Sequence, residues 1–380
     1  MVLANIKSKI GKGLACLCFA SLLLGCNAKP QEAPLLKAAS ISHDTKFGSA
    51  NISASEEDFE SLGFALGDSC DVLFSNGVSF LDVPYYNGYY VRNGEPVLVA
   101  YPSSETISFT LNNAGIWDSA QLDESYTVDI SLNQKGKYLA TQEALGQSYS
   151  LDRSKYSSDE EFCNFRSLKG GRIKEGRFYR GASPFDNSRL RAPVTDALLK
   201  QNGIKAIVDL ADGEGDMNAY LSDPSYSFPY SESLYESGDV ALLGMGSSYG
   251  SDSYKQSIGE GIRHMMSHEG PYYIHCMEGK DRTGFVCMLF ESMAGATYAE
   301  MKDDYMQTYA NYYKVTLKGT PEKYNAIVGL YFDSFCEYLL GESDKAKLEQ
   351  ASYEEAAKDY LRGSVLTEIE IIEFGEFLAQ

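Results

Sequence analysis

The chain has 380 residues, a formal net charge of −20 and 44% hydrophobic residues. This length suggests two domains or one large one, and the hydrophobic fraction is enough to form a sizeable core. The strong negative charge argues against nucleic acid or an anionic membrane surface as a partner, because both would repel an acidic protein. A site for an anion would therefore be a local pocket rather than part of a basic face.

The first 26 residues resemble a targeting segment. Three lysines precede an apolar run at 13–24, which is too short to span a membrane but suits a signal peptide. The run ends in Leu-Leu-Gly-Cys, which resembles the bacterial lipobox and would make Cys26 the lipidated residue. We therefore expect a lipoprotein signal peptide at 1–26 and an extracytoplasmic protein held at the bacterial cell membrane by its lipid. An ordinary signal peptide with an incidental cysteine is the alternative.

The next part of the chain changes character twice. Residues 27–55 are rich in Ala, Ser, Pro and Lys, which is typical of a flexible tether. From 56 to 150, short β-branched and aromatic segments are separated by Asn-Gly and Lys-Gly turns. This pattern predicts an all-β domain, either a small barrel or a sandwich. The tyrosine cluster at 85–90 favours cross-strand packing, and a ligand-facing surface is the alternative.

Strand and helix patterns alternate over residues 151–343, after a charged segment at its start. A buried strand is predicted at 205–210. Helices are predicted at 257–268, 297–313, 321–340 and 352–361. The alternation predicts an α/β domain with a mostly parallel sheet flanked by helices. The last of these helices belongs to a C-terminal helical segment at 344–380.

The segment 272–284 carries the residues on which a function can be based. The apolar run at 272–274 predicts the end of a buried strand, and the residues from Thr283 onward suit a buried helix. Cys276 and Arg282 lie in the loop between them. Backbone N–H groups at a helix start, together with the helix dipole, attract anions. Phosphate suits such a loop because each of its oxygens can accept several hydrogen bonds.

The residue types of this loop suit phosphoryl transfer. The N–H groups, the helix dipole, Lys280 and Arg282 favour the thiolate of Cys276, which can attack phosphorus and form a covalent thiophosphate. Arg282 can hold two phosphoryl oxygens in a bidentate fork. Thr283 can give its hydroxyl to the sulfur when the thiolate leaves. The predicted phosphate-binding residues are Met277, Glu278, Gly279, Lys280, Asp281 and Arg282.

The loop also carries a family resemblance. His-Cys-Met-Glu-Gly-Lys-Asp-Arg-Thr-Gly resembles the His-Cys-x5-Arg-Thr-Gly phosphate loop of cysteine-dependent protein tyrosine phosphatases, and its Gly-Lys-Asp-Arg-Thr version is similar to the bacterial tyrosine phosphatase-like family. The segments at 164–171, 176–184 and 203–210 resemble other parts of that family, so the resemblance covers about residues 160–340. It implies a phosphatase fold and hydrolysis of phosphate esters, most of all in phosphotyrosine proteins. No metal or cofactor is expected.

The general acid that protonates the leaving oxygen stays open between three aspartates. Asp281 lies inside the loop, where it could orient Arg282 or donate the proton. Asp209 ends a predicted strand and resembles the family's Asp-Leu-Arg position, although Ala211 stands where the arginine would be. Asp239 precedes the cysteine by a workable number of residues. We rank Asp281 first, Asp209 second and Asp239 third.

Two other motifs carry less weight. His264 and His268 stand four residues apart but lack a third metal ligand. The sequence at 246–250 matches Gly-x-Ser-x-Gly, yet a poor strand precedes it, so a Ser/Gly loop is predicted. Four cysteines are expected to be buried structural thiols: Cys70, Cys163, Cys287 and Cys336.

The substrate has one main alternative. Lys280 adds a second cation to the loop, as in lipid phosphatases, so a phosphoinositide or inositol phosphate is the alternative to a phosphotyrosine protein. The non-enzyme alternative is a surface binding lipoprotein whose function lies in its β domain. The intact pair of Cys276 and Arg282 argues against it. The sequence gives no oligomeric state.

Overall fold

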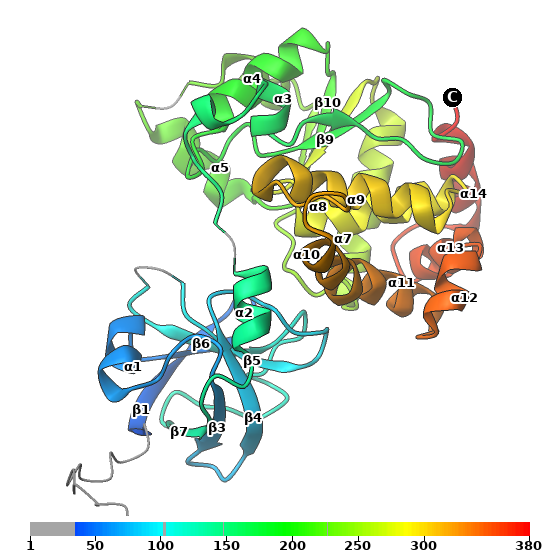
Figure 1. Cartoon of the computed structure of the whole chain (residues 1–380). Coiled ribbons are helices and arrows are strands. Elements are labelled where there is room, and N and C mark those ends of the chain that lie inside the picture. Colours follow the sequence, from blue (N-terminus) through cyan, green and yellow to red (C-terminus); the bar gives the residue numbers. More distant parts are fainter. Residues whose placement is uncertain (1–34, 102–103, 147, 226) are drawn as a thin grey trace, which may run out of the picture. The chain divides into compact units, whose positions relative to one another are not determined.

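The computed structural model describes residues 35–101, 104–146, 148–225 and 227–380 (Figure 1). The predicted signal peptide, including Cys26, lies outside the described residues. Among the helices that are described, none is both long and apolar enough to cross a membrane.

A closed seven-stranded barrel forms the first part of the described chain, in the order β1-β2-β6-β5-β4-β3-β7. The strands are β1 (Leu35–Asp44), β2 (Ser49–Ile52), β3 (Ser69–Phe74), β4 (Ser79–Tyr86), β5 (Pro96–Val99), β6 (Ile107–Leu111) and β7 (Thr127–Gln134). Two short helices, α1 (Glu56–Leu62) and α2 (Leu139–Leu145), accompany them. Alternate residues such as Val72, Phe109 and Ile130 fill the interior, as expected for a small barrel. The predicted all-β domain is thus a barrel rather than a sandwich.

The structure corrects the predicted tether from residue 35 onward. β1 pairs antiparallel with β2 and with β7, and Leu35 lies opposite Ser131. The Ala- and Ser-rich composition of β1 is unlike that of a strong strand, so its pairing with strands elsewhere in the chain decides its structure. The barrel therefore begins at Leu35 and not near residue 56.

A five-stranded sheet forms the centre of the second part, in the order β11-β10-β12-β9-β8. Its strands are β8 (Arg166–Ser167), β9 (Phe178–Gly181), β10 (Ala206–Asp209), β11 (Val240–Leu242) and β12 (Tyr272–His275). Only the β8–β9 pair is antiparallel, and the other neighbours are parallel. The mostly parallel sheet predicted from the sequence is confirmed.

Helices pack on both faces of this sheet. Ile274 and Val208 point into one apolar core, whereas Tyr273 and Ile207 point into the other. The helical elements are η1 (Arg153–Lys155), α3 (Asp159–Phe162), α4 (Ala192–Gln201), α5 (Glu214–Ser222), α6 (Pro229–Glu236), α7 (Asp252–Ser267), α8 (Asp281–Met293), α9 (Tyr298–Tyr313), α10 (Pro321–Ile327), the π-helical η2 (Val328–Phe332), α11 (Asp333–Leu340), α12 (Lys345–Gln350), α13 (Glu354–Arg362) and α14 (Glu368–Phe377). The strand-and-helix alternation predicted for this region is confirmed.

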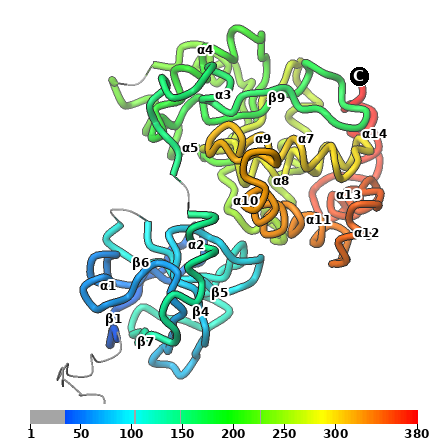
Figure 2. The backbone as a smooth tube through the Cα atoms, in the orientation of Figure 1, coloured from blue at the N-terminus to red at the C-terminus, as the bar shows by residue number. Residues whose placement is uncertain are grey.

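The C-terminal segment is helical, as predicted, and it belongs to the same core. Leu348, Tyr360 and Phe374 are buried there, and α13 contacts both α7 and α8. Figure 2 shows α12 and α13 beside α11, and α14 packs next to α13. Helix α8 (Asp281–Met293), which follows the loop that contains Cys276, is therefore held in place by α13.

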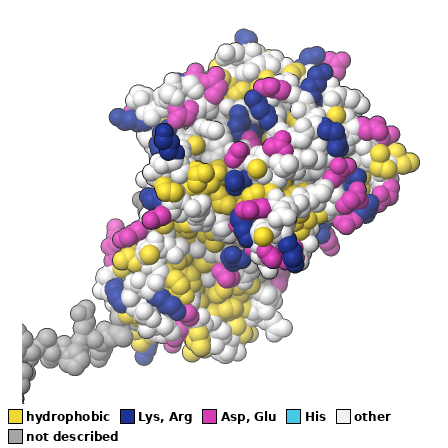
Figure 3. Space-filling view, turned by 45° about the vertical axis from the view of Figure 1, so that its right-hand side comes forward, with side chains coloured by type: hydrophobic (Ala, Val, Ile, Leu, Met, Phe, Trp, Pro, Cys, Tyr) yellow, Lys and Arg dark blue, Asp and Glu magenta, His cyan; other side chains and the backbone are white. Residues whose placement is uncertain are grey.

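The surface carries charges of both signs. Figure 3 shows acidic and basic side chains interspersed over the visible face, with no basic region standing out. This agrees with a net charge of −20 and with anion binding confined to a pocket.

Candidate active site

The cysteine loop lies between β12 and α8, at the carboxyl ends of the parallel strands. Helix α8 begins at Asp281 and is buried from Thr283 to its end, so its start is fixed in place. Among the described residues, the backbone N–H groups of 277–282 have no hydrogen-bond acceptor within the protein. Unpaired N–H groups at a helix start form a natural anion site.

Gly279 lets this loop lie against the neighbouring strand. Its φ is +64°, and a Cβ built there would stand 2.2 Å from the carbonyl oxygen of Gly181 at the end of β9. No other residue can occupy this position without moving the loop or the strand. The glycine at this position of the motif is therefore required for steric reasons.

A buried charged network holds the carbonyl group of Gly279. The Arg180 guanidinium donates to this oxygen at 2.9 Å and the Asn164 amide donates to it at 3.1 Å. Arg180 also pairs with Asp304, and Arg166 pairs with the same carboxylate at 2.6 Å. Both arginines are thereby fixed behind the loop.

Glu278 is held by three neighbouring side chains. Its carboxylate pairs with Arg189 at 3.3 Å and accepts a hydrogen bond from the Tyr149 hydroxyl, while Tyr312 donates to its backbone carbonyl at 2.8 Å. Burial alone would raise the pKa of Glu278, but Lys280, Tyr149 and the nearby arginines hold it below its usual value. This side chain is thus an anion engaged in positioning the loop.

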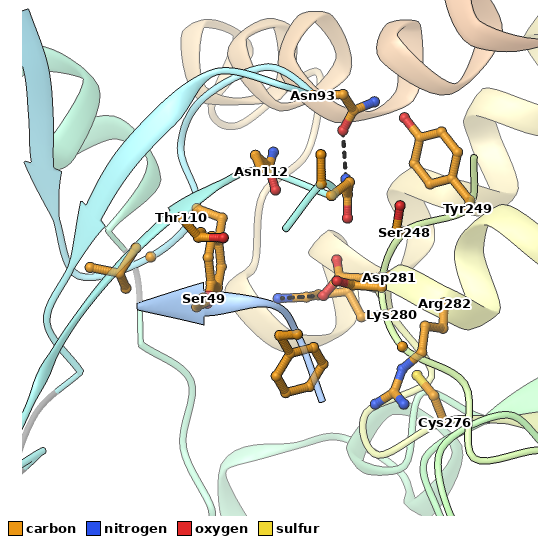
Figure 4. Close-up of a pocket in the computed structure, with 18 of the residues that line it drawn as sticks. Ser49, Asn93, Thr110, Asn112, Ser248, Tyr249, Cys276, Lys280, Asp281 and Arg282 are labelled. Atoms are coloured by element: carbon orange, nitrogen blue, oxygen red, sulfur yellow. Dashed lines mark hydrogen bonds and ion pairs between the residues drawn. The ribbon is translucent and has the colours of Figure 1, made fainter. Parts of the chain in front are cut away.

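Cys276 and Arg282 line one pocket of about 850 Å³, which Figure 4 shows in close-up. The Cys276 side chain is only 4% exposed, and its thiol is free. Arg282 donates to the carbonyl of Met245 at 2.9 Å, which fixes the guanidinium in the wall of the pocket. The volume lies within the range of about 300–1,000 Å³ that is typical of small-molecule sites.

Lys280 and Thr283 complete the loop chemistry. Burial would lower the pKa of Lys280, but Asp281, Tyr313 and Glu278 hold it well above its usual value, so this residue stays cationic. The Thr283 hydroxyl is fully buried and has no hydrogen-bond partner in the described part of the chain. A buried hydroxyl of this kind is available to a group that forms only during a reaction.

The structure separates the three candidate acids. Asp281 lines the pocket with Cys276, is 66% exposed and lies 3.7 Å from the Lys280 ammonium group. Asp209 is fully buried at the end of β10 and does not line the pocket. Asp239 precedes β11, so it lies at the opposite end of the sheet from the loop. We therefore do not retain Asp239 as a candidate acid.

Asp209 belongs to a buried cluster with Asp212 and His275. Burial raises the pKa of Asp209 to about 7 against the hydrogen bonds from the backbone of Ala211 and Asp212. Burial and the charge of Asp209 also raise the pKa of Asp212 to about 7. Burial lowers the pKa of His275 to about 4, so its imidazole is neutral at pH 7. The cluster can therefore hold a proton near neutral pH.

The remaining sequence motifs have structural roles. Burial raises the pKa of Cys70, Cys163, Cys287 and Cys336 to about 12, which is the behaviour of inert core thiols. His264 and His268 stack on each other, and no group of three or more potential ligands that could hold a metal occurs in the described residues. The Gly-x-Ser-x-Gly match is a loop, as predicted, and Ser248 lines the pocket.

The tyrosine cluster at 85–90 takes part in apolar packing, and its second half also lines the pocket. Tyr85 packs inside the barrel and Tyr86 packs in a second apolar cluster, which agrees with cross-strand packing. Tyr89 and Tyr90 line the pocket. Both also pack against the cluster that contains Tyr86, so the ligand-facing role of the second half stays a prediction.

Three further residues, which were not predicted from the sequence, position the loop: Asn164, Arg180 and Asp304. Asn164 and Arg180 fix the loop from behind through the carbonyl of Gly279, and Asp304 acts through its ion pair with Arg180. Asn164 and Arg180 lie within segments that resemble the phosphatase family, and this was the available signal. Asp304 lies on α9 and carried no signal of its own.

Comparisons with known proteins agree with this geometry. The model of a tyrosine phosphatase family matches residues 160–364, which is more than half of the chain. No curated protein matches. A solved structure, that of an uncharacterized conserved protein from Thermotoga maritima, is 15% identical, with 25% of this chain and 35% of that chain covered and a TM-score of 0.21. The chain thus spans about a third of that protein, and the likeness is too slight to support an argument. On the family match, the chain belongs to the tyrosine phosphatase family.

Proposed function

We propose that this protein is a cysteine-dependent phosphomonoesterase that works through a covalent cysteinyl-phosphate. The observation that carries the proposal is the free Cys276 in a pocket whose floor is a loop of unpaired backbone N–H groups with Arg282 at its end. Such donors stabilise the charge on phosphoryl oxygens during transfer.

The proposed reaction has two steps. The Cys276 sulfur attacks phosphorus, the ester P–O bond breaks, and the leaving oxygen takes a proton from a carboxylic acid. Water then attacks phosphorus and gives a proton to the carboxylate left by the first step, the S–P bond breaks, and inorganic phosphate leaves while the Thr283 hydroxyl donates to the returning thiolate. Asp281 is the first candidate acid because it shares the pocket with Cys276.

Two substrate classes are candidates. Membership of the tyrosine phosphatase family favours a phosphotyrosine protein. The polar lining of the pocket and the cationic Lys280 favour a phosphorylated polyol, which includes the inositol phosphates. Either substrate would use the same loop and the same nucleophile.

We further propose that the enzyme acts outside the cytoplasm, anchored to the bacterial cell membrane through lipid on Cys26. The proposal rests on the apolar run at 13–24 and on the Leu-Leu-Gly-Cys sequence that follows it. A phosphatase on a tether would meet substrates near the membrane surface.

Replacement of Cys276 by serine tests the proposed function. A serine hydroxyl cannot supply a comparable anion at neutral pH, so Cys276→Ser is expected to abolish turnover of an activated aryl phosphate. The variant should still bind a phosphate analogue such as tungstate, because the N–H groups and Arg282 remain. Appreciable turnover by this variant would contradict the covalent mechanism.

A further inference from the structure

The outer face of the barrel contributes a polar wall to the catalytic pocket. Strands β2 and β6 pair so that Ala50 lies opposite Phe109 in the barrel interior. The alternate residues point outward, and they line the pocket: Ser49, Asn51, Ser108 and Thr110. We name these four residues the polar wall.

Two of the four residues of the polar wall are shielded from solvent. Ser49 is 2% exposed and Thr110 is 3% exposed, although both lie on the outside of a barrel. Figure 4 shows them lining the same pocket as Cys276 and Arg282. The Thr110 hydroxyl donates to the carbonyl of Leu111 at 3.3 Å. A hydroxyl that donates can still accept, so a ligand that offers hydroxyl groups would find acceptors in this wall.

Other parts of the pocket have the same chemistry. The loop between β11 and α7 contributes Ser247, Ser248 and Ser251, and the barrel contributes the amides Asn93 and Asn113. Tyr89 and Tyr101 add aromatic surface. Rigid aromatic rings that pack on C–H faces, together with adaptable hydroxyl and amide groups, suit a ring that bears hydroxyl groups.

The charges of the pocket fit one phosphate. Its lining includes three cations and three carboxylates: Lys46, Lys280, Arg282, Asp44, Glu278 and Asp281. Lys280 is already close to Glu278 and Asp281, at 3.8 and 3.7 Å. Arg282 belongs to the phosphate loop, so among the described residues that line the pocket a second phosphate would meet only Lys46 as a further cation, and a third phosphate would meet none.

We propose that this pocket selects a polyol or saccharide that carries a single phosphate ester, with the polar wall binding the hydroxyl groups of the carrier. The proposal rests on the proposed phosphatase function and specifies its substrate class. A phosphotyrosyl side chain has no hydroxyl group besides the esterified one and so would make no hydroxyl hydrogen bonds to the wall. An inositol carrying several phosphates would exceed the cations available.

Substrate comparison tests the proposal with the full chain. A hexose 6-phosphate, a maltotriose monophosphate and inositol monophosphate are compared with a phosphotyrosine peptide, inositol hexakisphosphate and an activated aryl phosphate. At least one polyol monophosphate is expected to have a higher kcat/KM than both the peptide and the hexakisphosphate. The saccharide and inositol arms then identify the source of the carrier. A peptide or hexakisphosphate with the highest kcat/KM would overturn the proposal.

Variants of the polar wall give a second readout. The double variant Asn51→Leu/Thr110→Val should lower kcat/KM for the preferred polyol by roughly five- to thirtyfold more than for the aryl phosphate, because each lost hydrogen bond contributes roughly fivefold. Thr127→Val, on the outer face of β7 and outside the pocket lining, is the matched control and should change neither value. Equal losses on both substrates in the double variant would overturn the proposed wall.

A charge-gain variant tests the single-phosphate part. Asn51→Lys adds a cation to the wall and should raise the kcat/KM of an inositol bisphosphate relative to the monophosphate. No change in that ratio would contradict the charge argument. These results differ from what would be seen if the proposed phosphatase function were wrong. In that case the aryl phosphate itself would show no Cys276-dependent turnover.

Discussion

Replacement of Gly279 by alanine should disable the phosphate loop without unfolding the protein. An alanine Cβ at this position would lie 2.2 Å from the Gly181 carbonyl oxygen, whereas Cβ atoms essentially never approach closer than 3.0 Å. The loop or β9 must therefore move by about 0.8 Å. A misplacement of about 1 Å in an active site can cost roughly 100-fold in rate, and we expect a loss of this order in kcat/KM.

Gly203→Ala provides a matched control. Gly203 has nearly the same backbone conformation, with φ of +62°, but a Cβ there would have open space around it. Both variants carry the cost of about 1–2 kcal/mol for an alanine in the left-handed region. Only Gly279→Ala adds the steric contact, so the difference between the two isolates the displacement of the loop.

The assay combines turnover and stability. Urea unfolding shows that each variant is folded under the assay conditions, and hydrolysis of an activated aryl phosphate gives kcat/KM. Gly203→Ala should be less stable than the unmodified protein yet equally active. A Gly279→Ala variant whose kcat/KM lies within about twofold of the Gly203→Ala value would refute the claim that this contact sets the loop geometry.

Three other predictions address the acid, the pH dependence and the anchor. If Asp281 is the acid, Asp281→Asn should lower the rate on alkyl phosphates by about 10²- to 10⁴-fold and the rate on an activated aryl phosphate much less. Equal losses on both substrates would mean instead that Asp281 orients Arg282. The same comparison on Asp209→Asn tests the second candidate. Because burial raises the pKa of Asp209 and Asp212 to about 7, the folded state holds protons that the unfolded chain releases near pH 4. These two carboxyl groups should therefore lower the free energy of unfolding as pH rises from about 4 to about 7, while His275, whose pKa burial lowers to about 4, contributes in the opposite direction. Asp209→Asn removes one of the two carboxyl contributions, so its free energy of unfolding in urea titrations should fall less, or rise more, over this range than that of the unmodified protein; an unchanged slope would contradict the buried-proton assignment. Cys26→Ala should leave the protein unprocessed or release it from the membrane fraction, and unchanged processing and partition would contradict the lipobox interpretation.

The central loop was predictable because its determinants are local. The apolar run before the cysteine and the buried helix after it are continuous in sequence, and they form β12 and α8. The residue types within the loop also limit its chemistry. The barrel strands that follow residue 56 were predictable as separate strands. Their closure into a barrel was not, because it depends on pairings between distant segments.

The missed features depend on the fold. The hydrogen bonds from Asn164 and Arg180 to Gly279 join residues 115 and 99 positions apart, and no local pattern signals such contacts. Asp239 was ranked by separation along the chain, but the direction of β11 places it at the wrong end of the sheet. The β1 strand looked like a linker because its partner β7 lies at the other end of the barrel sequence.

Trapping of the covalent intermediate tests the central claim most directly. Rapid mixing with an activated aryl phosphate, acid quenching and peptide mass spectrometry should find a phosphoryl group on Cys276, together with a burst of phenolate close to the enzyme concentration if breakdown of the adduct limits turnover. The adduct should be absent from Cys276→Ser. Sustained turnover with no phosphorylated Cys276 peptide, or with full activity in the serine variant, would contradict the account.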